Sequence, residues 1–169
     1  MRKIIQRALE LKLPPRTSAF LWGPRRVGKS FWIRQTFPDA TLIDLLKSDV
    51  FHEYASRPAL LRERLAGKRG VVVIDEVQKV PALLDEVHWL IENTRLSFLL
   101  SGSSARKLRR GHANLLAGRA RRRQLVPFLR REVGEFDLER AMTSGFLPPH
   151  FFVPRARRRS ARVRRRLLA

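Results

Sequence analysis

Glycine, lysine and serine near the N-terminus fall at a spacing that suits phosphate binding. Residues 23–30 read GPRRVGKS and match the pattern G-x-x-x-x-G-K-[ST]. We expect Gly23 and Gly28 to let the backbone curl so that its N–H groups point at phosphate oxygens, where a side chain would block the approach. Lys29 would reach the β- and γ-phosphates, and the Ser30 hydroxyl would bind Mg²⁺. The predicted nucleotide-contacting residues of this loop are Gly23, Pro24, Arg25, Arg26, Val27, Gly28, Lys29 and Ser30.

Two adjacent carboxylates end the apolar run VVVIDE, at Asp75 and Glu76. A run that is apolar on both faces is typical of a strand buried in a parallel sheet. Asp75 would lie at the carboxyl-terminal edge of that strand and is predicted to hold Mg²⁺, because hard oxygen ligands suit that ion. Glu76, which would point the other way, is predicted to accept a proton from an attacking water.

Hydroxyl groups end a third apolar run, SFLLSGSS. Ser101 is predicted to orient the water or to contact the γ-phosphate. Ser103 or Ser104, just beyond it, are alternative candidates for the same role. Serine after a strand is also ordinary turn chemistry, so a purely structural role stays open.

These side chains need a framework that brings them to one edge of a sheet. The apolar patterns predict strands at 18–22, 41–46, 70–76, 96–102 and 122–128. They predict helices at 2–11, 29–37, 47–66, 81–94, 103–117 and 135–145. Strands that alternate with helices indicate an α/β fold, a parallel sheet with helices on both faces. The loop at 23–30 would then lie between a strand and a helix, as phosphate binding requires.

Four segments, in this order and spacing, resemble the AAA-type ATPases of bacteria and archaea that usually carry a C-terminal, nuclease-like domain of unknown function. They are LWGPRRVGKS, VVVIDEVQKVP, SFLLSGSSARKLRRGHANLLAGRA and SGFLPPH, within about residues 1–150. The resemblance implies a five-stranded P-loop sheet in the order 5-1-4-3-2, with the sensor strand between the two Walker strands. It implies ATP and Mg²⁺ as ligands and ATP hydrolysis. Residues 23–30 would be Walker A, Asp75 and Glu76 Walker B, and Ser101 sensor 1.

AAA-type enzymes usually need an arginine, from the same chain or from a neighbour, to stabilise the charge that develops on the transferring group. Arg119 is the first candidate by position and Arg106 the second. A contribution from a neighbour would require a homo-oligomer, which the sequence leaves open. In a chain with 29 arginines, a plain surface role for either residue also stays open.

The chain is strongly basic, with 36 Lys and Arg against 15 Asp and Glu and a net charge of +21. Such a field attracts nucleic acid. A second hypothesis is therefore a basic nucleic-acid-binding module, in which arginines such as Arg121–Arg123 line the path. A solvated basic face and a decayed ATPase fragment without turnover are the remaining alternatives.

Arginine dominates the last residues, where 155–169 hold eight arginines and no acid. We predict an ATPase domain at 1–150 and an Arg-rich, disordered tail at 151–169. One hypothesis for the tail is a shifted reading frame or truncation, and the other is a genuine basic arm for nucleic acid. The absence of cysteine excludes disulfides and thiolate metal sites. Without a signal peptide or an apolar span of ~20 residues, the sequence predicts a soluble, cytoplasmic protein without membrane contact.

Overall fold

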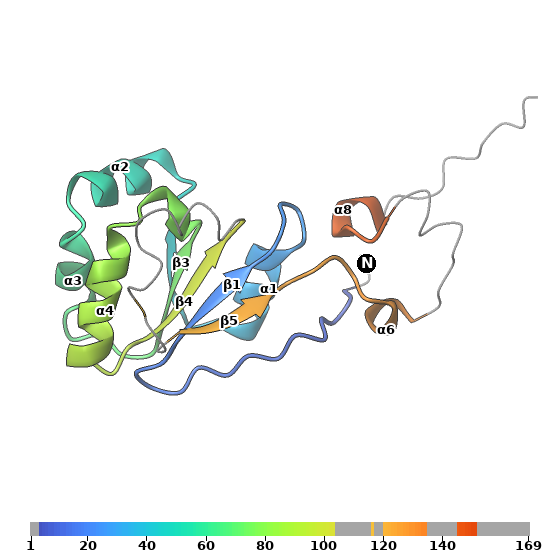
Figure 1. Ribbon diagram of the computed structural model, residues 1–169, viewed down its shortest axis with the longest axis horizontal. Helices are drawn as coiled ribbons and strands as arrows, with labels where there is room; N and C mark the ends of the chain where they lie inside the picture. The colour runs from blue at the N-terminus through green and yellow to red at the C-terminus, as the bar shows by residue number, and fades with distance from the viewer. Residues whose placement is uncertain (1–3, 104–115, 117–119, 135–144, 152–169) are drawn as a thin grey trace, which may run out of the picture.

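Five parallel strands form a single sheet in the computed structural model, which describes residues 4–103, 116, 120–134 and 145–151. The strands are β1 Ser18–Trp22, β2 Thr41–Asp44, β3 Val71–Asp75, β4 Ser97–Gly102 and β5 Ala120–Gln124. Their order across the sheet is β2-β3-β4-β1-β5, and each neighbouring pair is parallel (Figure 1). This is the expected order 5-1-4-3-2 read from the other edge, so the predicted α/β fold is confirmed, with β4 between β1 and β3.

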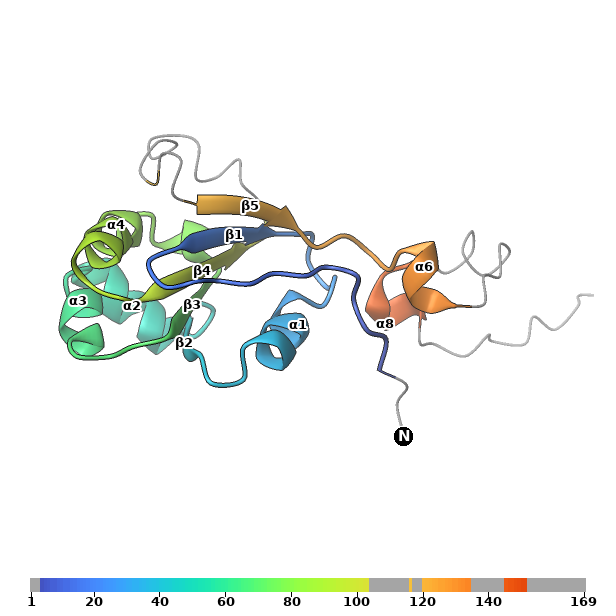
Figure 2. The same ribbon diagram turned by 90° about the horizontal axis from the view of Figure 1, so that it is seen from below.

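Helices cover both faces of the sheet. They are α1 Lys29–Thr36, α2 Ser48–Ser56, α3 Leu60–Leu65 and α4 Leu83–Asn93, with a 3-10 helix, η1, at Val77–Lys79. Two short helices follow β5, α6 at Arg130–Val133 and α8 at Pro148–Phe151. Helices α2, α3 and α4 pack on one face and α1 on the other (Figures 1 and 2). Beyond the carboxyl-terminal edge of the sheet, α6 and α8 lie close to the N-terminal segment.

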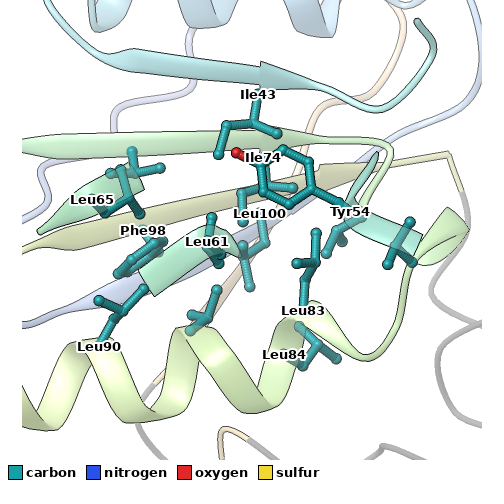
Figure 3. Packing of buried hydrophobic residues seen from close by; sticks show 14 of the residues in the cluster. Ile43, Tyr54, Leu61, Leu65, Ile74, Leu83, Leu84, Leu90, Phe98 and Leu100 are labelled. Atoms are coloured by element: carbon teal, nitrogen blue, oxygen red, sulfur yellow. The ribbon is translucent and has the colours of Figure 1, made fainter. Parts of the chain in front are cut away.

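Side chains of the central strands alternate between two apolar clusters. On β3, Val72 and Ile74 pack in the cluster with α2, α3 and α4, whereas Val73 packs in the cluster with α1. Figure 3 shows Ile74 and Leu100 from the sheet beside Tyr54 and Leu61 from the helices, in the first cluster. Because both faces are buried, a continuous β-branched run suits β3, and its carboxylates emerge only where the strand ends.

The predicted helix at 2–11 is wrong. Residues 4–13 contain no helix and run as an extended segment along the sheet (Figure 2). Leu11 is buried in the cluster with α1, and the Ala8 N–H donates to the Glu132 carboxylate at 2.6 Å rather than to a helical carbonyl. A short helix is marginal on its own, so these long-range contacts decide the conformation.

The fifth strand begins and ends earlier than the predicted 122–128. β5 covers Ala120–Gln124 and pairs with β1, after which the Leu125 N–H donates to the Trp22 carbonyl at 2.7 Å. Leu125 and Phe128 are apolar because they are buried beyond the strand, whereas Arg121 to Arg123 within it are exposed. The apolar pattern therefore marked the segment after the strand, where Leu125 and Phe128 are buried, instead of the strand itself. The predicted helices at 103–117 and 135–145 lie largely outside the described residues.

Candidate functional site

The loop at residues 23–30 joins β1 to α1 at the carboxyl-terminal edge of the sheet. Gly28 precedes α1 with a φ of 92°, and Arg26 has a φ of 64°. This left-handed region is readily accessible to glycine, so Gly28 permits the sharp entry into α1. The N–H groups in the first turn of α1 lack helical partners, and together with the helix dipole they favour an anion at this end.

Gly23 lies in a tight backbone contact at the end of β1. A Cβ at Gly23 would lie closer to the Leu125 carbonyl oxygen than real Cβ atoms approach, and 3.1 Å from Val27 Cγ1. The Gly23 N–H also donates to the Gly102 carbonyl at 3.3 Å. Glycine at this position therefore allows the backbone at the end of β1 to pack against the chain that leaves β5, and its predicted role beside a phosphate stays a prediction.

Replacing Gly23 with alanine is expected to lower the free energy of unfolding by about 1–3 kcal/mol, the usual cost of overpacking. The neighbour is a backbone carbonyl and not the far end of a flexible side chain, so the main chain itself would have to shift. Urea unfolding of Gly23→Ala and of the wild type measures the difference. A change smaller than about 0.5 kcal/mol would show that the backbone yields at this contact.

Lys29 is buried at the base of this loop, with 7% of its surface exposed. Its Nζ donates to the carbonyl oxygens of Gly23 at 2.8 Å and Pro24 at 3.3 Å. Burial lowers the pKa of Lys29, Glu76 and Asp75 oppose that shift, and the positive charge of Arg25 adds to it. Because desolvation is the largest of these effects, a bound anion would relieve the cost of the buried ammonium.

Asp75 joins the loop to two strands. Its Oδ2 accepts a hydrogen bond from the Ser30 hydroxyl at 3.0 Å, and its Oδ1 accepts from the Ser101 hydroxyl and from the Glu76 N–H. Three residues expected at the site, from α1, β3 and β4, thus meet at one carboxylate that is 6% exposed. In this arrangement Ser101 holds Asp75, and its predicted contact with water or the γ-phosphate stays a prediction.

Glu76 leaves the strand conformation with a φ of 57°, so its direction is not set by simple alternation along β3. Its Oε2 accepts hydrogen bonds from the Ser103 hydroxyl at 3.2 Å and from Gln78 Nε2. Gln78 was not predicted from the sequence, where its place two residues after Glu76 is the one hint of its role. A Cβ on Gly102 would collide with the Gln78 carboxamide, so this glycine makes room for it.

The polar groups gathered here fit a phosphate chain with a hard cation. The Ser30 hydroxyl and the Asp75 carboxylate are oxygen ligands of the kind that Mg²⁺ prefers, and this ion usually takes its remaining ligands from water and phosphate. The described residues contain no cluster of three His, Cys, Asp or Glu that could cage a metal. Gln78 Oε1 is buried without a hydrogen-bond partner in the described part of the chain, which leaves one further acceptor beside Glu76.

A family model described as an AAA domain matches residues 15–134, which hold all of this geometry. The chain belongs to the AAA domain family. The AAA domain is a P-loop domain of nucleotide-binding, ATPase type.

Known proteins are similar to part of this chain. Uncharacterized proteins of Mycobacterium bovis and Mycobacterium tuberculosis are each 31% identical over 136 residues, which is 78% of this chain and 30% of theirs. A Walker-type ATPase of Pyrococcus abyssi is 17% identical with a TM-score of 0.49, over 74% of this chain and 53% of that one. The ORC1 protein of Aeropyrum pernix, solved in complex with DNA, is 16% identical with a TM-score of 0.49, over 69% and 41%.

Several predictions for this AAA domain fall on residues without a structural description. Arg119, Arg106 and Ser104 lie there, as do residues 152–169 of the predicted tail. Among the residues that the structure covers, no helix has the length and apolar character needed to cross a membrane.

Proposed function

We propose that this chain binds Mg-ATP at the 23–30 loop and hydrolyses it with Glu76 as the general base. The observation that carries the proposal is the 3.0 Å hydrogen bond from Ser30 to Asp75. It joins the loop to the carboxylate pair although 45 residues separate them in the chain. A phosphate-binding loop beside a buried carboxylate is the arrangement that phosphoryl transfer with a metal ion needs.

Each residue has a chemical task in this proposal. The N–H groups of the loop and the Lys29 ammonium bind the phosphates, while Ser30 and Asp75 hold Mg²⁺. Held by these two residues, Mg²⁺ would supply positive charge against the charge that develops on the phosphates. Gln78 and Ser103 position Glu76 by hydrogen bonds to its carboxylate. Glu76 accepts the proton of the attacking water.

The remaining machinery of hydrolysis is proposed from the resemblance alone. Arg119, with Arg106 as the second candidate, would stabilise the transferring charge, either within one chain or across a homo-oligomer. The chain spans 30% of the length of the curated relatives that it matches. What hydrolysis drives in the whole protein, and whether this chain alone completes it, therefore belong to the proposal.

Titration with a fluorescent ATP analogue tests the proposal directly. The expected result is saturable binding that EDTA weakens, that ATP reverses, and that AMP does not, because AMP lacks the β- and γ-phosphates that Lys29 contacts. Raised salt suppresses the non-specific attraction of polyanions to a chain of charge +21. The proposal is contradicted if a folded protein binds no analogue. It is also contradicted if AMP displaces the bound analogue as well as ATP does.

Nucleic-acid binding is a second candidate, favoured by the exposed arginines of β5. Arg121, Arg122 and Arg123 are exposed on a strand that pairs on one side only within the described residues. Exposed guanidinium groups on the strand at a sheet edge suit a phosphate backbone.

Replacing Arg121, Arg122 and Arg123 with alanine is expected to flatten the salt dependence of duplex DNA binding. If each arginine neutralises one phosphate, the slope of log K against log salt falls by about 3. The matched control removes three exposed arginines elsewhere, Arg34, Arg57 and Arg69. Fluorescence anisotropy over a salt series gives both slopes, and equal slopes for the two triple variants would contradict a path along β5.

A further inference from the structure

Arg7 lies at the centre of a buried polar cluster that the proposed mechanism does not use. Its side chain is 7% exposed, and its three guanidinium nitrogens reach three parts of the chain. Nε lies 3.2 Å from both carboxylate oxygens of Glu132, and one terminal nitrogen donates to the Val27 carbonyl at 2.9 Å. The other terminal nitrogen donates to the Val126 carbonyl and lies 3.5 Å from that of Pro127.

Glu132 fixes this guanidinium in place. Its side chain is 3% exposed, and besides Arg7 it accepts hydrogen bonds from the Ala8 N–H at 2.6 Å and the Leu129 N–H at 2.8 Å. The Arg7 guanidinium also lies over the Phe128 ring, 5.0 Å from its centre. A buried charge pair costs desolvation energy, so a fully hydrogen-bonded pair at this place calls for a role beyond stability.

The contact between Arg7 and the Val27 carbonyl indicates what that role is. The Val27 C=O and the Gly28 N–H belong to one planar trans peptide unit, in which the two groups point in opposite directions. When Arg7 holds the carbonyl, it therefore also sets where the Gly28 N–H points. The side chain of Val27 is fully buried in the cluster with α1, so the peptide is held from both sides.

We propose that Arg7 is a positioning residue of the 23–30 loop, which it orients through the Val27 carbonyl while Glu132 holds the guanidinium. The inference rests on the proposed nucleotide function of this loop. Arginine suits the task because its rigid fork donates in several directions at once, whereas a lysine ammonium is a single point charge. Through the same fork the chain that follows β5, at Val126 to Glu132, is tied to the loop.

An experiment without nucleotide separates this inference from the proposed function. NMR of the wild type and of Arg7→Met compares the carbonyl carbon resonance of Val27 and the amide resonance of Gly28. Both are expected to shift in the variant, because the carbonyl loses its donor and the peptide unit is free to rotate. Unchanged resonances in a folded variant would overturn the proposal whether or not the protein binds ATP.

The second readout is affinity for the fluorescent ATP analogue with Mg²⁺. Arg7→Met is expected to weaken binding at least tenfold, and Arg7→Lys to restore part of the loss, because a charge remains opposite Glu132. A shift of the Val27 and Gly28 resonances with unchanged affinity would also overturn the role in binding. If the wild type binds no nucleotide, the proposed function fails, and the NMR comparison still decides whether Arg7 orients the loop.

Two further variants keep the test decisive. Arg57→Met removes an exposed ion pair with Glu63 and serves as the matched control, in which loop resonances and affinity are expected to stay unchanged. If Arg7→Met does not fold, Arg7→Lys and Glu132→Gln take its place, since the first keeps the positive charge and the second keeps the size and shape of the side chain. Each is expected to shift the Val27 carbonyl resonance, and the absence of a shift in both would overturn the proposal.

Discussion

Replacing Glu76 with glutamine is expected to lower ATP turnover by about 10²- to 10⁴-fold while leaving nucleotide affinity nearly unchanged. Glutamine keeps the shape of the side chain but cannot accept the proton of an attacking water, and loss of a general base costs a factor of this size. Turnover is measured by phosphate release at saturating ATP, and affinity by the fluorescent analogue. A fall in turnover without a fall in affinity is the signature of a group that acts in the chemical step.

The matched control for this variant is Glu10→Gln, which removes the same charge at an exposed position of the N-terminal segment. It is expected to turn over ATP at the wild-type rate. Turnover by Glu76→Gln within about threefold of the wild type would contradict the role of Glu76 and would place the base elsewhere. A parallel loss of affinity would instead show that Glu76 helps to bind nucleotide, through its proximity to Lys29.

Replacing Lys29 with methionine is expected to weaken binding of the ATP analogue by about 10- to 100-fold, the worth of hydrogen bonds to a charged group. The same change is expected to alter the free energy of unfolding by less than about 1 kcal/mol. It removes two hydrogen bonds to loop carbonyls but also removes a buried charge that the fold disfavours. The control is Lys68→Met, which removes an exposed lysine and is expected to bind normally.

The lowered pKa of Lys29 determines how the difference in the free energy of unfolding between Lys29→Met and the wild type changes with pH. Between the pKa in the folded protein and the higher one in the unfolded chain, the unfolded chain binds more protons, so stability rises with pH. Lys29→Met lacks this contribution. Its stability relative to the wild type should therefore fall as the pH rises through that alkaline window, and urea unfolding over a pH series measures it. A difference that does not depend on pH would contradict the buried charge.

The sheet and the meeting of Ser30, Asp75 and Ser101 could be predicted because their signals are local. Each apolar run ends in the polar residue that the site needs, and parallel strands place those ends at a common edge. The roles of Arg7 and Gln78 were missed for opposite reasons. The partner of Arg7 is Glu132, 125 residues away, so no local pattern connects them. Gln78 is close in sequence to Glu76 but has no pattern of its own.

The wrong element boundaries have a common cause. At 2–11 and 122–128, apolar side chains are buried by distant parts of the chain and not by the regular structure that their spacing predicted. Leu11 packs into the cluster with α1 from an extended segment, and Leu125 joins the same cluster just after β5 ends. Burial without periodic secondary structure cannot be distinguished from an amphipathic helix or strand by spacing alone.

The position of β1 between β4 and β5 also sets the order in which the molecule can fold. Ser18 pairs with Phe98 on one side and with Ala120 on the other, so both partners of β1 are distant in the chain. Closing such long loops costs entropy before any pairing offsets it, which slows folding. During synthesis β1 must wait until about 80 further residues have been added. The strand that carries the 23–30 loop is thus made first among the strands and completed last.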